Sequence, residues 1–190
     1  MIEVTAAQAE VTAARAEVTA AAQAKVTTAL AEVTAAALAA QPFLRGMPGD
    51  QLGLLAETAR EVRFPAGHRL FEDGGHAGRF WLIQCGYVAL DLHVPGEGPV
   101  VIDHVGLGGL LGWSWRFPPY RWAFGAVAIS PLRTFEFSAP AVRERCAANP
   151  ALGYELTERI NRVLALRLRA TRVRLLRPGE RGQVVSGRPS

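Results

Sequence analysis

The sequence of 190 residues has few cysteines, no long apolar segment and no secretory signature. Its two cysteines, Cys85 and Cys146, lie far apart and match no metal-binding or CxxC spacing, so neither a disulfide framework nor a thiolate metal site is expected. Cys85 lies in an apolar run and is expected in the core. No apolar run approaches the ~20 residues of a membrane-spanning helix, and the chain start, Met1-Ile2-Glu3, lacks the basic region of a secretory signal. We therefore expect a soluble, cytoplasmic protein.

Catalytic signatures are also missing. The sequence contains no nucleophile elbow, no Walker loop and no dinucleotide-binding glycine fingerprint, and GLGG at 106–109 is expected to be a turn. A metal site of the cupin type would need an HxH pair, whereas the four histidines are scattered. Asp91 and Asp103 are expected in hairpin strands, where solvated positions explain both. We expect neither an enzyme nor a metal centre. The histidines, all expected on the surface or in turns, are His68, His76, His93 and His104.

The charged residues are distributed unevenly. The formal net charge is +4, but residues 159–190 contain nine arginines and one acidic residue, Glu180, so the rest of the chain is acidic. A basic helix can contact nucleic-acid phosphates or anionic lipid, but it more often presents a solvated outer face. Glu155 precedes Arg159 by four residues, which is the favourable order for an ion pair on a helix and supports the second interpretation.

Residues 1–40 form a low-complexity segment. The triplet EVT recurs at Glu3, Glu10, Glu17 and Glu32, with KVT at Lys25. Steps close to seven keep the valines near one face, and alanine favours a helix. A weak coiled-coil arm is one interpretation. A solvent-exposed, partly frayed helix encoded by an expanded repeat is favoured, because a Val/Ala seam buries little area and threonine lowers helix propensity.

Residues 41–150 are expected to form a β-roll or jelly roll with flanking helices, a mostly β fold. A short amphipathic run around Leu52 and Leu55 predicts one helix. Short apolar stretches then alternate with turns rich in Gly, Pro and Asp, which is typical of such rolls. Gly86 is expected at a hairpin turn or bulge. The stretches are EVRF, HRLF, RFWLIQCGYVALDLHV, VVIDHVG, WAFGAVAI and LRTFEF.

The C-terminal part changes to helical periodicity. SAPAVRERCAAN predicts a helix capped by Ser138, and Asn149-Pro150 is expected to end it and to begin another. Residues 151–177 predict one long amphipathic helix. Such a helix would expose much of its outer face on one domain, so we expect it to pair in a homodimer. Residues 178–190 are expected to be disordered. The apolar stripe consists of Leu156, Ile160, Leu164, Leu168, Thr171 and Leu175.

The most informative stretch is GGLLGWSWRFPPYRWAFGAVA, from Gly108 to Ala128. It holds three of the four tryptophans, with further aromatic residues, around Arg121. An arginine among aromatic and small residues suits an anion bound by the guanidinium and backbone N–H groups. The same pattern is typical of a buried aromatic corner whose arginine stacks on a ring or reaches solvent. The stretch alone leaves both interpretations open.

The order of these pieces resembles the cyclic-nucleotide-binding domain of the Crp/Fnr regulators. The matching pieces span residues 42–177: PFLRGMP before the first helix, FPAGHRLFEDGG at the early strands, FWLIQCGYVAL at the centre and GLGGLLGWSWRF at the start of the phosphate-binding cassette. The resemblance implies the β-roll, a long dimer helix, and a pocket for a cyclic nucleotide such as cAMP or cGMP.

The resemblance also implies roles for the cassette residues. In the family a Gly-Glu pair binds the ribose and an Arg-Ser/Thr-Ala run binds the cyclic phosphate. Gly112 matches the glycine, and Arg121, Trp122 and Ala123 align with the run, although Trp122 replaces its hydroxyl residue. Trp113 stands in place of the carboxylate, and the unpaired sugar hydroxyl that results would cost about 1–3 kcal/mol. The pocket is therefore expected either to prefer a more apolar or aromatic ligand or to be vestigial.

The long helix supplies one further match. Thr171 matches a threonine of the family's dimer helix that reaches the adenine, whereas Arg172 replaces the serine that follows it. A small residue on a helix seam is the other interpretation of Thr171.

The sequence thus predicts a non-enzymatic ligand sensor that signals through its dimer helix to an unknown partner protein, a step that rests on analogy. One alternative is a degenerate module that binds no small molecule and serves as a dimerisation or docking scaffold. Another is a truncated transcription regulator that contacts DNA through its basic helix. Only residues 178–190 follow Arg177, so a helix-turn-helix module of about 60–80 residues, and with it direct sequence-specific DNA binding, is not expected.

Overall fold

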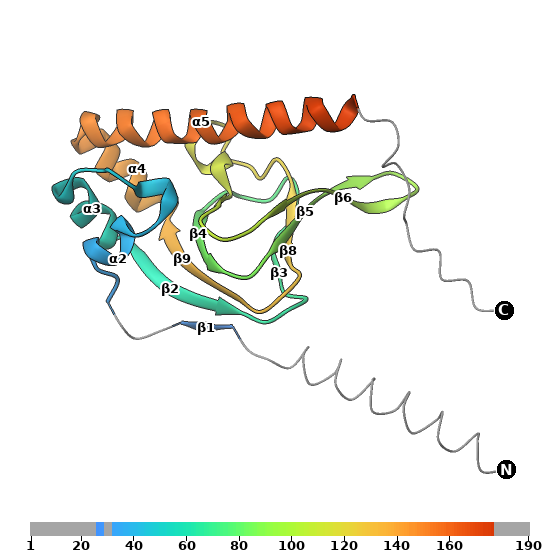
Figure 1. The fold of residues 1–190 in the computed structure, drawn as a ribbon, viewed down its shortest axis with the longest axis horizontal. Coiled ribbons are helices and arrows are strands. Elements are labelled where there is room, and N and C mark those ends of the chain that lie inside the picture. Colours follow the sequence, from blue (N-terminus) through green and yellow to red (C-terminus); the bar gives the residue numbers. More distant parts are fainter. Residues whose placement is uncertain (1–25, 29–31, 177–190) are drawn as a thin grey trace, which may run out of the picture.

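Two antiparallel sheets and a set of flanking helices make up the computed structural model, which describes residues 26–28 and 32–176. The sheets have strand orders β1-β2-β9-β4-β7 and β3-β8-β5-β6. Together they form a roll with helices at one end and one long helix lying across it (Figure 1). The predicted fold class is confirmed. The strands are β1 (Thr27–Thr28), β2 (Ala59–Phe64), β3 (Arg69–Phe71), β4 (Arg79–Cys85), β5 (Val88–Val94), β6 (Gly98–Val105), β7 (Leu110–Leu111), β8 (Gly125–Ala128) and β9 (Leu132–Ser138).

Helices flank the roll before its first long strand and after its last. α2 and α3 contact each other on the N-terminal side, and α4 contacts α5 on the C-terminal side. One short 3-10 helix, η2, interrupts the strands between β7 and β8. The helices are α2 (Ala35–Ala39), η1 (Pro42–Leu44), α3 (Gly49–Ala56), η2 (Trp113–Arg116), α4 (Ala139–Ala148) and α5 (Pro150–Leu175).

Aromatic rings form the centre of the core. Phe80 on β4 stacks between Trp115 of η2 and Phe137 of β9, with ring centroids 4.7 Å apart in each pair. All three side chains are almost completely buried. Stacked rings of this size bury large apolar areas, so this stack fixes η2 to the sheet.

The boundary between α4 and α5 lies where the sequence predicts it. The Oδ1 atom of Asn149 accepts a hydrogen bond from the backbone N–H of Leu152 at 3.1 Å and caps α5, while Pro150 occupies its first turn. Ser138 is the residue preceding α4, as predicted, but its side chain makes no capping hydrogen bond.

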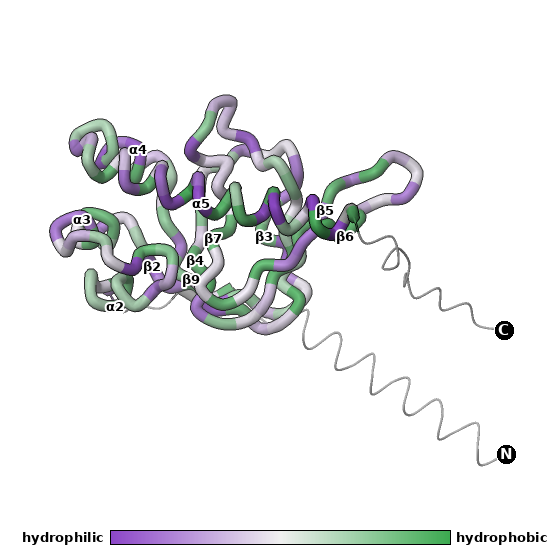
Figure 2. The backbone as a smooth tube through the Cα atoms, turned by 45° about the horizontal axis from the view of Figure 1, so that its top comes forward, coloured by the Kyte–Doolittle hydropathy of each residue, from purple (hydrophilic) through white to green (hydrophobic). Residues whose placement is uncertain are grey.

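The two halves of α5 have different surroundings. Leu152, Leu156 and Ile160 in the first half are buried against the domain. In the second half, Leu166 and Leu168 are exposed by 67% and 53%. Figure 2 shows hydrophilic and hydrophobic residues interspersed along this helix. The apolar stripe therefore continues beyond the surface that the domain itself can cover.

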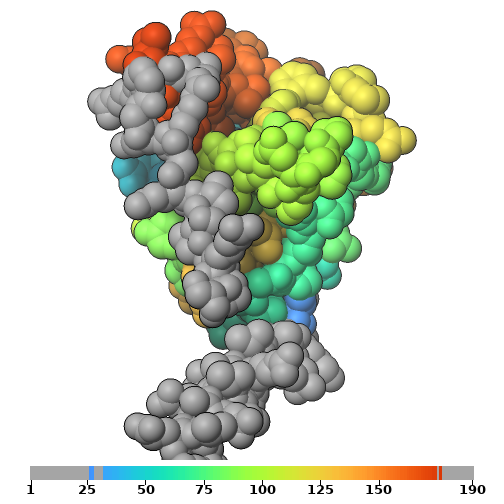
Figure 3. Space-filling view, turned by 90° about the vertical axis from the view of Figure 1, so that its right-hand side faces the viewer, coloured from blue at the N-terminus to red at the C-terminus, as the bar shows by residue number. Residues whose placement is uncertain are grey.

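Strands β5 and β6 form a hairpin that projects from the roll. Its register pairs Val88 with Val105 and Val94 with Gly98. Its outer part appears as a light green cluster in front of the body in Figure 3. Of the two structures predicted at Gly86, a hairpin turn or a bulge, the hairpin is wrong, because β4 and β5 belong to different sheets and Gly86 lies in the bend that joins them.

Two side chains differ from their predicted environments. Cys85, expected in the core, is exposed at the end of β4. Asp91, expected in solvent, is buried, and its Oδ2 atom accepts a hydrogen bond from Nη1 of Arg69. A carboxylate can be buried at this position because the guanidinium of Arg69, on β3 of the same sheet, reaches across β8 and compensates its charge.

The described part of the N-terminal segment differs from one continuous helix. Thr27 and Thr28 form β1 and pair with β2, whose edge they extend, as β-branched residues favour. Helix α2 begins separately after Thr34, whose Oγ1 atom accepts a hydrogen bond from the backbone N–H of Ala37 at 3.2 Å. The remaining predictions for 1–40, and the one for 178–190, lie outside the described residues.

Candidate functional site

The cassette (residues 108–125) includes β7 and connects it to β8 through η2. Gly112 ends β7 with φ +84°, a left-handed conformation that glycine adopts without a steric penalty. The chain then forms η2 and returns towards β8 through Arg121, which makes an isolated β-bridge with His76. The backbone thus brings the two arms of the cassette together, as the resemblance implies.

Arg121 is bound on the outside of the cassette. Its side chain is exposed, and Nη1 donates a hydrogen bond to the carbonyl of Gly74 at 2.8 Å. The adjacent backbone pairs as well: the N–H of Trp122 donates to the carbonyl of Gly75 at 2.8 Å. Arg121 therefore fastens the turn before β4 to the cassette.

Trp122 points the opposite way, into the roll. Its indole is buried and stacks on Phe71, with ring centroids 4.1 Å apart, and lies 5.8 Å from Trp81. It also borders Gly112, where an added Cβ would lie 2.7 Å from Cζ3 of the indole. The space beside Gly112, where the resemblance implies the ribose, is filled by an aromatic ring.

A further backbone donor of the cassette, the N–H of Ala123, is also occupied. The backbone N–H of Ala123 donates a hydrogen bond to Oγ of Ser114 at 3.2 Å, and Ser114 itself is buried. This bond joins η2 to the returning strand. It satisfies a backbone donor that an anion in the cassette would otherwise use.

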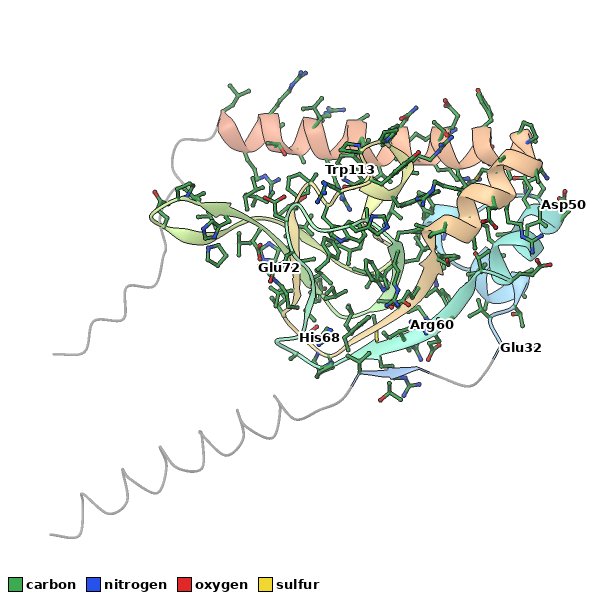
Figure 4. The ribbon with its side chains drawn as sticks, turned by 180° about the vertical axis from the view of Figure 1, so that it is seen from behind. Glu32, Asp50, Arg60, His68, Glu72 and Trp113 are labelled. Atoms are coloured by element: carbon green, nitrogen blue, oxygen red, sulfur yellow. The ribbon has the colours of Figure 1, made fainter. Side chains whose placement is uncertain are left out.

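A cavity of about 290 Å³ lies between the roll and the second half of α5. Trp113 of the cassette and Thr171 of α5 both line it, and Trp113 is seen below α5 in Figure 4. Its volume is just below the range of small-molecule sites, about 300–1,000 Å³. The full lining is Leu90, Ile102, Asp103, Trp113, Phe124, Leu164, Arg167, Leu168, Thr171 and Arg174.

Arg167 brings a partly desolvated positive charge to this cavity. Nη2 donates a hydrogen bond to the carbonyl of Leu110 at 2.5 Å, which ties α5 to the end of β7. Burial lowers the pKa of the Arg167 guanidinium, and the charge of Asp103 opposes that shift. Within the described residues, no carboxylate lies within ion-pair distance of Arg167. A guanidinium held by a neutral carbonyl alone retains donors for an anion.

Arg174 and Asp103 close the far end of the cavity. Nη1 of Arg174 lies 3.1 Å from Oδ1 of Asp103, and Nη2 lies 3.4 Å from Oγ1 of Thr171. Oδ1 of Asp103 also accepts a hydrogen bond from the backbone N–H of His104 at 2.9 Å. These contacts join α5 to the β5–β6 hairpin.

The structure thus separates the six predicted site residues into two groups. Trp113 and Thr171 line the cavity. The other four, Gly112, Arg121, Trp122 and Ala123, belong to the cassette but are not among the lining residues. Ligand contact by all six stays a prediction. Arg167, Arg174 and Asp103 are not among the predicted site residues, because the sequence pattern favours a solvated face for the helix arginines and a solvated strand position for Asp103. A signal was present: Leu164, Arg167, Thr171 and Arg174 follow at steps of three, four and three, which places them on one face of a helix.

Comparisons with known proteins agree with this fold. No family model matches the chain. A "CRP-like cAMP-activated global transcriptional regulator" of Mycobacterium tuberculosis is 28% identical over 134 residues, which are 70% of this chain and 58% of that protein. The chain thus spans little more than half the length of the curated relatives that it matches.

Solved structures are similar as well. A structure described as a cyclic nucleotide-binding protein of Geobacter metallireducens is 26% identical with a TM-score of 0.62, covering 67% of this chain and 92% of that one. A cyclic nucleotide-binding domain of Methylobacillus flagellatus is 23% identical with a TM-score of 0.63, covering 73% and 78%. The resemblance to the Crp/Fnr type of cyclic-nucleotide-binding domain is confirmed. Among the described helices, none is sufficiently long and apolar to cross a membrane.

Proposed function

We propose that this domain is a ligand sensor of the Crp/Fnr type that binds a cyclic nucleotide or a related organic anion in the cavity beneath α5. The observation that carries the proposal is Arg167, a partly buried guanidinium whose hydrogen bond goes to a backbone carbonyl. Burying a cation without a counter-ion is unfavourable, and an anionic ligand would compensate that cost. The relative of Mycobacterium tuberculosis is described as cAMP-activated, which supports this ligand class.

The ligand's charged group contacts Arg167 in this proposal and does not reach Arg121. Arg121 already bonds to Gly74, and the indole of Trp122 fills the space beside Gly112. Trp113 and Phe124 offer aromatic surface to the rest of the ligand. A base or another flat ring suits such walls, in line with the preference for a more aromatic ligand inferred from Trp113.

Signalling would follow from the contacts that hold α5 on the roll at this cavity. Arg167 and Arg174 connect α5 to the end of β7 and to the β5–β6 hairpin, respectively. A ligand anion would compete for both guanidinium groups and so change how the second half of α5 is held. With a homodimer formed through this helix, as we propose, the change alters the angle between two helices that a partner protein can read.

Calorimetric titration of the whole chain with cAMP and cGMP tests the proposal. Arg167→Gln is expected to weaken binding by at least about tenfold, since hydrogen bonds to charged groups contribute roughly 1.5–3 kcal/mol. Arg121→Gln is expected to leave the affinity unchanged, and Arg162→Gln, on the exposed face of the same helix, is the matched control. Loss of binding in Arg121→Gln alone would instead place the anion in the cassette.

One observation favours a second candidate function. The cassette is closed by its own residues: Trp122 packs beside Gly112, and Ser114 occupies the N–H of Ala123. A domain of this kind could act as a dimerisation or docking scaffold without a ligand. Absence of binding heat from a folded protein with either nucleotide would favour this function over the sensor.

A further inference from the structure

A second cleft, of about 490 Å³, lies near the start of α5, between η2, α4 and the first turns of that helix. Its walls include Arg116 of η2, Arg143 and Cys146 of α4, and Tyr154 of α5. It has no lining residue in common with the cavity beneath the second half of α5. The two are therefore separate sites on the same domain.

Both arginines of the cleft have neutral partners only. Nε and Nη2 of Arg116 donate to Oγ1 of Thr157 at 3.2 and 3.1 Å. Nη1 of Arg143 donates to the carbonyl of Trp115 at 3.0 Å, and its guanidinium lies 4.5 Å from the centre of the Tyr120 ring. In the part of the chain that the structure describes, no carboxylate lies within 4.0 Å of either group. Each retains N–H donors for a further acceptor.

The start of α5 adds to this positive field. Pro150 and Gly153 of its first turn line the cleft, and the N-terminal end of a helix carries a partial positive charge. The charge of Arg116 also acts on the thiol of Cys146, where it opposes the effect of burial on the pKa. Two guanidinium groups and a helix end thus act on one space.

The opposite wall is apolar. It includes Cys146, Ala147 and Tyr154, and Tyr154 is 68% exposed. We propose that this cleft is a second ligand site, for a small organic anion: a phosphate or carboxylate group binds between Arg116 and Arg143, and its ring or alkyl body packs on Tyr154. Few convergent polar groups in an otherwise apolar cleft are typical of small-molecule sites.

The two cysteines provide a direct test in the unmodified chain. Cys146 lines the cleft, whereas Cys85 is exposed on the roll and serves as the internal control. Alkylation at each residue is followed by peptide mass spectrometry, with anionic iodoacetate and with neutral iodoacetamide. The ratio of the two rates cancels the thiolate fraction, because both reagents attack through the same thiolate. We expect the ratio of the iodoacetate rate to the iodoacetamide rate to be at least about threefold higher at Cys146 than at Cys85, since positive clefts concentrate anions.

Ligand binding is tested with phenyl phosphate as the probe. About 10 mM phenyl phosphate is expected to slow alkylation of Cys146 by iodoacetamide at least about threefold, as a millimolar Kd requires. Phenol at the same concentration, and Cys85 in the same sample, are expected to show no slowing. Equal protection by phenol, or no protection of Cys146, would overturn the proposal.

Variants separate the cleft from the cavity beneath α5. Arg143→Gln is expected to abolish protection by phenyl phosphate, and Arg145→Gln, an exposed arginine on the same helix that pairs with Glu57, is the matched control. Arg167→Gln is expected to leave the protection intact. The outcome at Cys146 therefore does not depend on whether the domain binds a cyclic nucleotide. If Arg143→Gln reduces folding, the phenyl phosphate and phenol comparison in the unmodified chain still decides the question.

Discussion

The indole of Trp122 lies directly against Gly112, although nine positions separate the two residues along the cassette. A Cβ added to Gly112 would come within 2.7 Å of Cζ3 of the indole, and Gly112 has φ +84°. A small residue and a large one are thus fitted to each other at the place where the resemblance implies a ligand. The packing of this pair decides whether the cassette can hold a phosphate.

Gly112→Ala is expected to lower the free energy of unfolding by about 2–4 kcal/mol, because a clash adds to the cost of a positive φ. Gly46→Ala is the matched control: its φ is +75°, but nothing lies within 4 Å of the added Cβ. That variant should lose only about 1–2 kcal/mol. Urea denaturation followed by circular dichroism measures both. Equal losses would mean that Trp122 moves aside at no cost.

A double-mutant cycle assigns the clash to the indole. Phenylalanine at position 122 keeps an aromatic ring on Phe71 but removes the part of the indole nearest to Gly112. In the Trp122→Phe background, Gly112→Ala should cost little more than Gly46→Ala does, which gives a coupling free energy of about 1 kcal/mol or more. A coupling near zero would place the cost of Gly112→Ala elsewhere in the cassette.

The ion pair of Asp91 and Arg69 gives a second stability prediction. Asp91 is buried, and hydrogen bonds from Arg69 to Asp91 and Glu72 raise the pKa of the guanidinium further above its usual value. Asp91→Asn should lower the free energy of unfolding by about 2–4 kcal/mol, less than a fully buried pair because Arg69 is partly exposed. The exposed pair of Glu57 and Arg145 is the control, and Glu57→Gln should cost under about 1 kcal/mol. Similar losses in both variants would contradict this account.

Much of the fold was predictable because it depends on local patterns. The boundary at Asn149-Pro150 follows from capping and proline chemistry, and α5 follows from its apolar stripe. The stripe did not predict that Leu156 would be buried by the domain and Leu168 exposed, since that depends on where the roll ends. The predicted exposure of Asp91 was wrong for the same kind of reason, because its partner Arg69 comes from another strand.

The candidate site was less predictable than the fold. The order of glycine, arginine and tryptophan marked the cassette, but it does not say which side chain points inward. That choice is made by Phe71, which stacks on Trp122, and by Gly74, whose carbonyl binds Arg121. Both precede the cassette by a long stretch of chain. The sequence predicted that Arg167 lies on a helix, but not that it lines a cavity, because the cavity forms only where α5 packs on the roll.

The thiol of Cys146 gives a pH prediction. Burial raises the pKa of Cys146, and the charge of Arg116 lowers it by a smaller amount. The midpoint of its alkylation rate against pH should therefore lie above that of free cysteine, and Arg116→Gln should move it higher. Measurement in a Cys85→Ser background gives a single thiol. A midpoint below that of free cysteine would contradict the assignment.

The same shift has a consequence for stability. A thiol whose pKa is raised by folding keeps its proton in the folded state after the unfolded chain has lost it. The free energy of unfolding should then decrease as pH rises above the ordinary thiol value of about 8.5, until the pKa of the folded state is passed. Cys146→Ala should remove this part of the decrease, whereas Cys85→Ser should not.

The proposed dimer is tested by two leucines on the exposed half of α5. Leu168, 53% exposed at the rim of the cavity, continues the apolar stripe where the roll no longer covers it and is the seam position of the proposed dimer. Leu166 lies on the other side of the helix, away from that seam. Leu168→Glu should convert the dimer to a monomer, because a charge at a seam position must be desolvated opposite its own copy. Leu166→Glu, an equally large change at a side chain of greater exposure, should leave the dimer intact. Sedimentation velocity distinguishes the two species. A monomer in the unmodified chain, or dissociation by both variants alike, would mean that α5 does not pair through this seam.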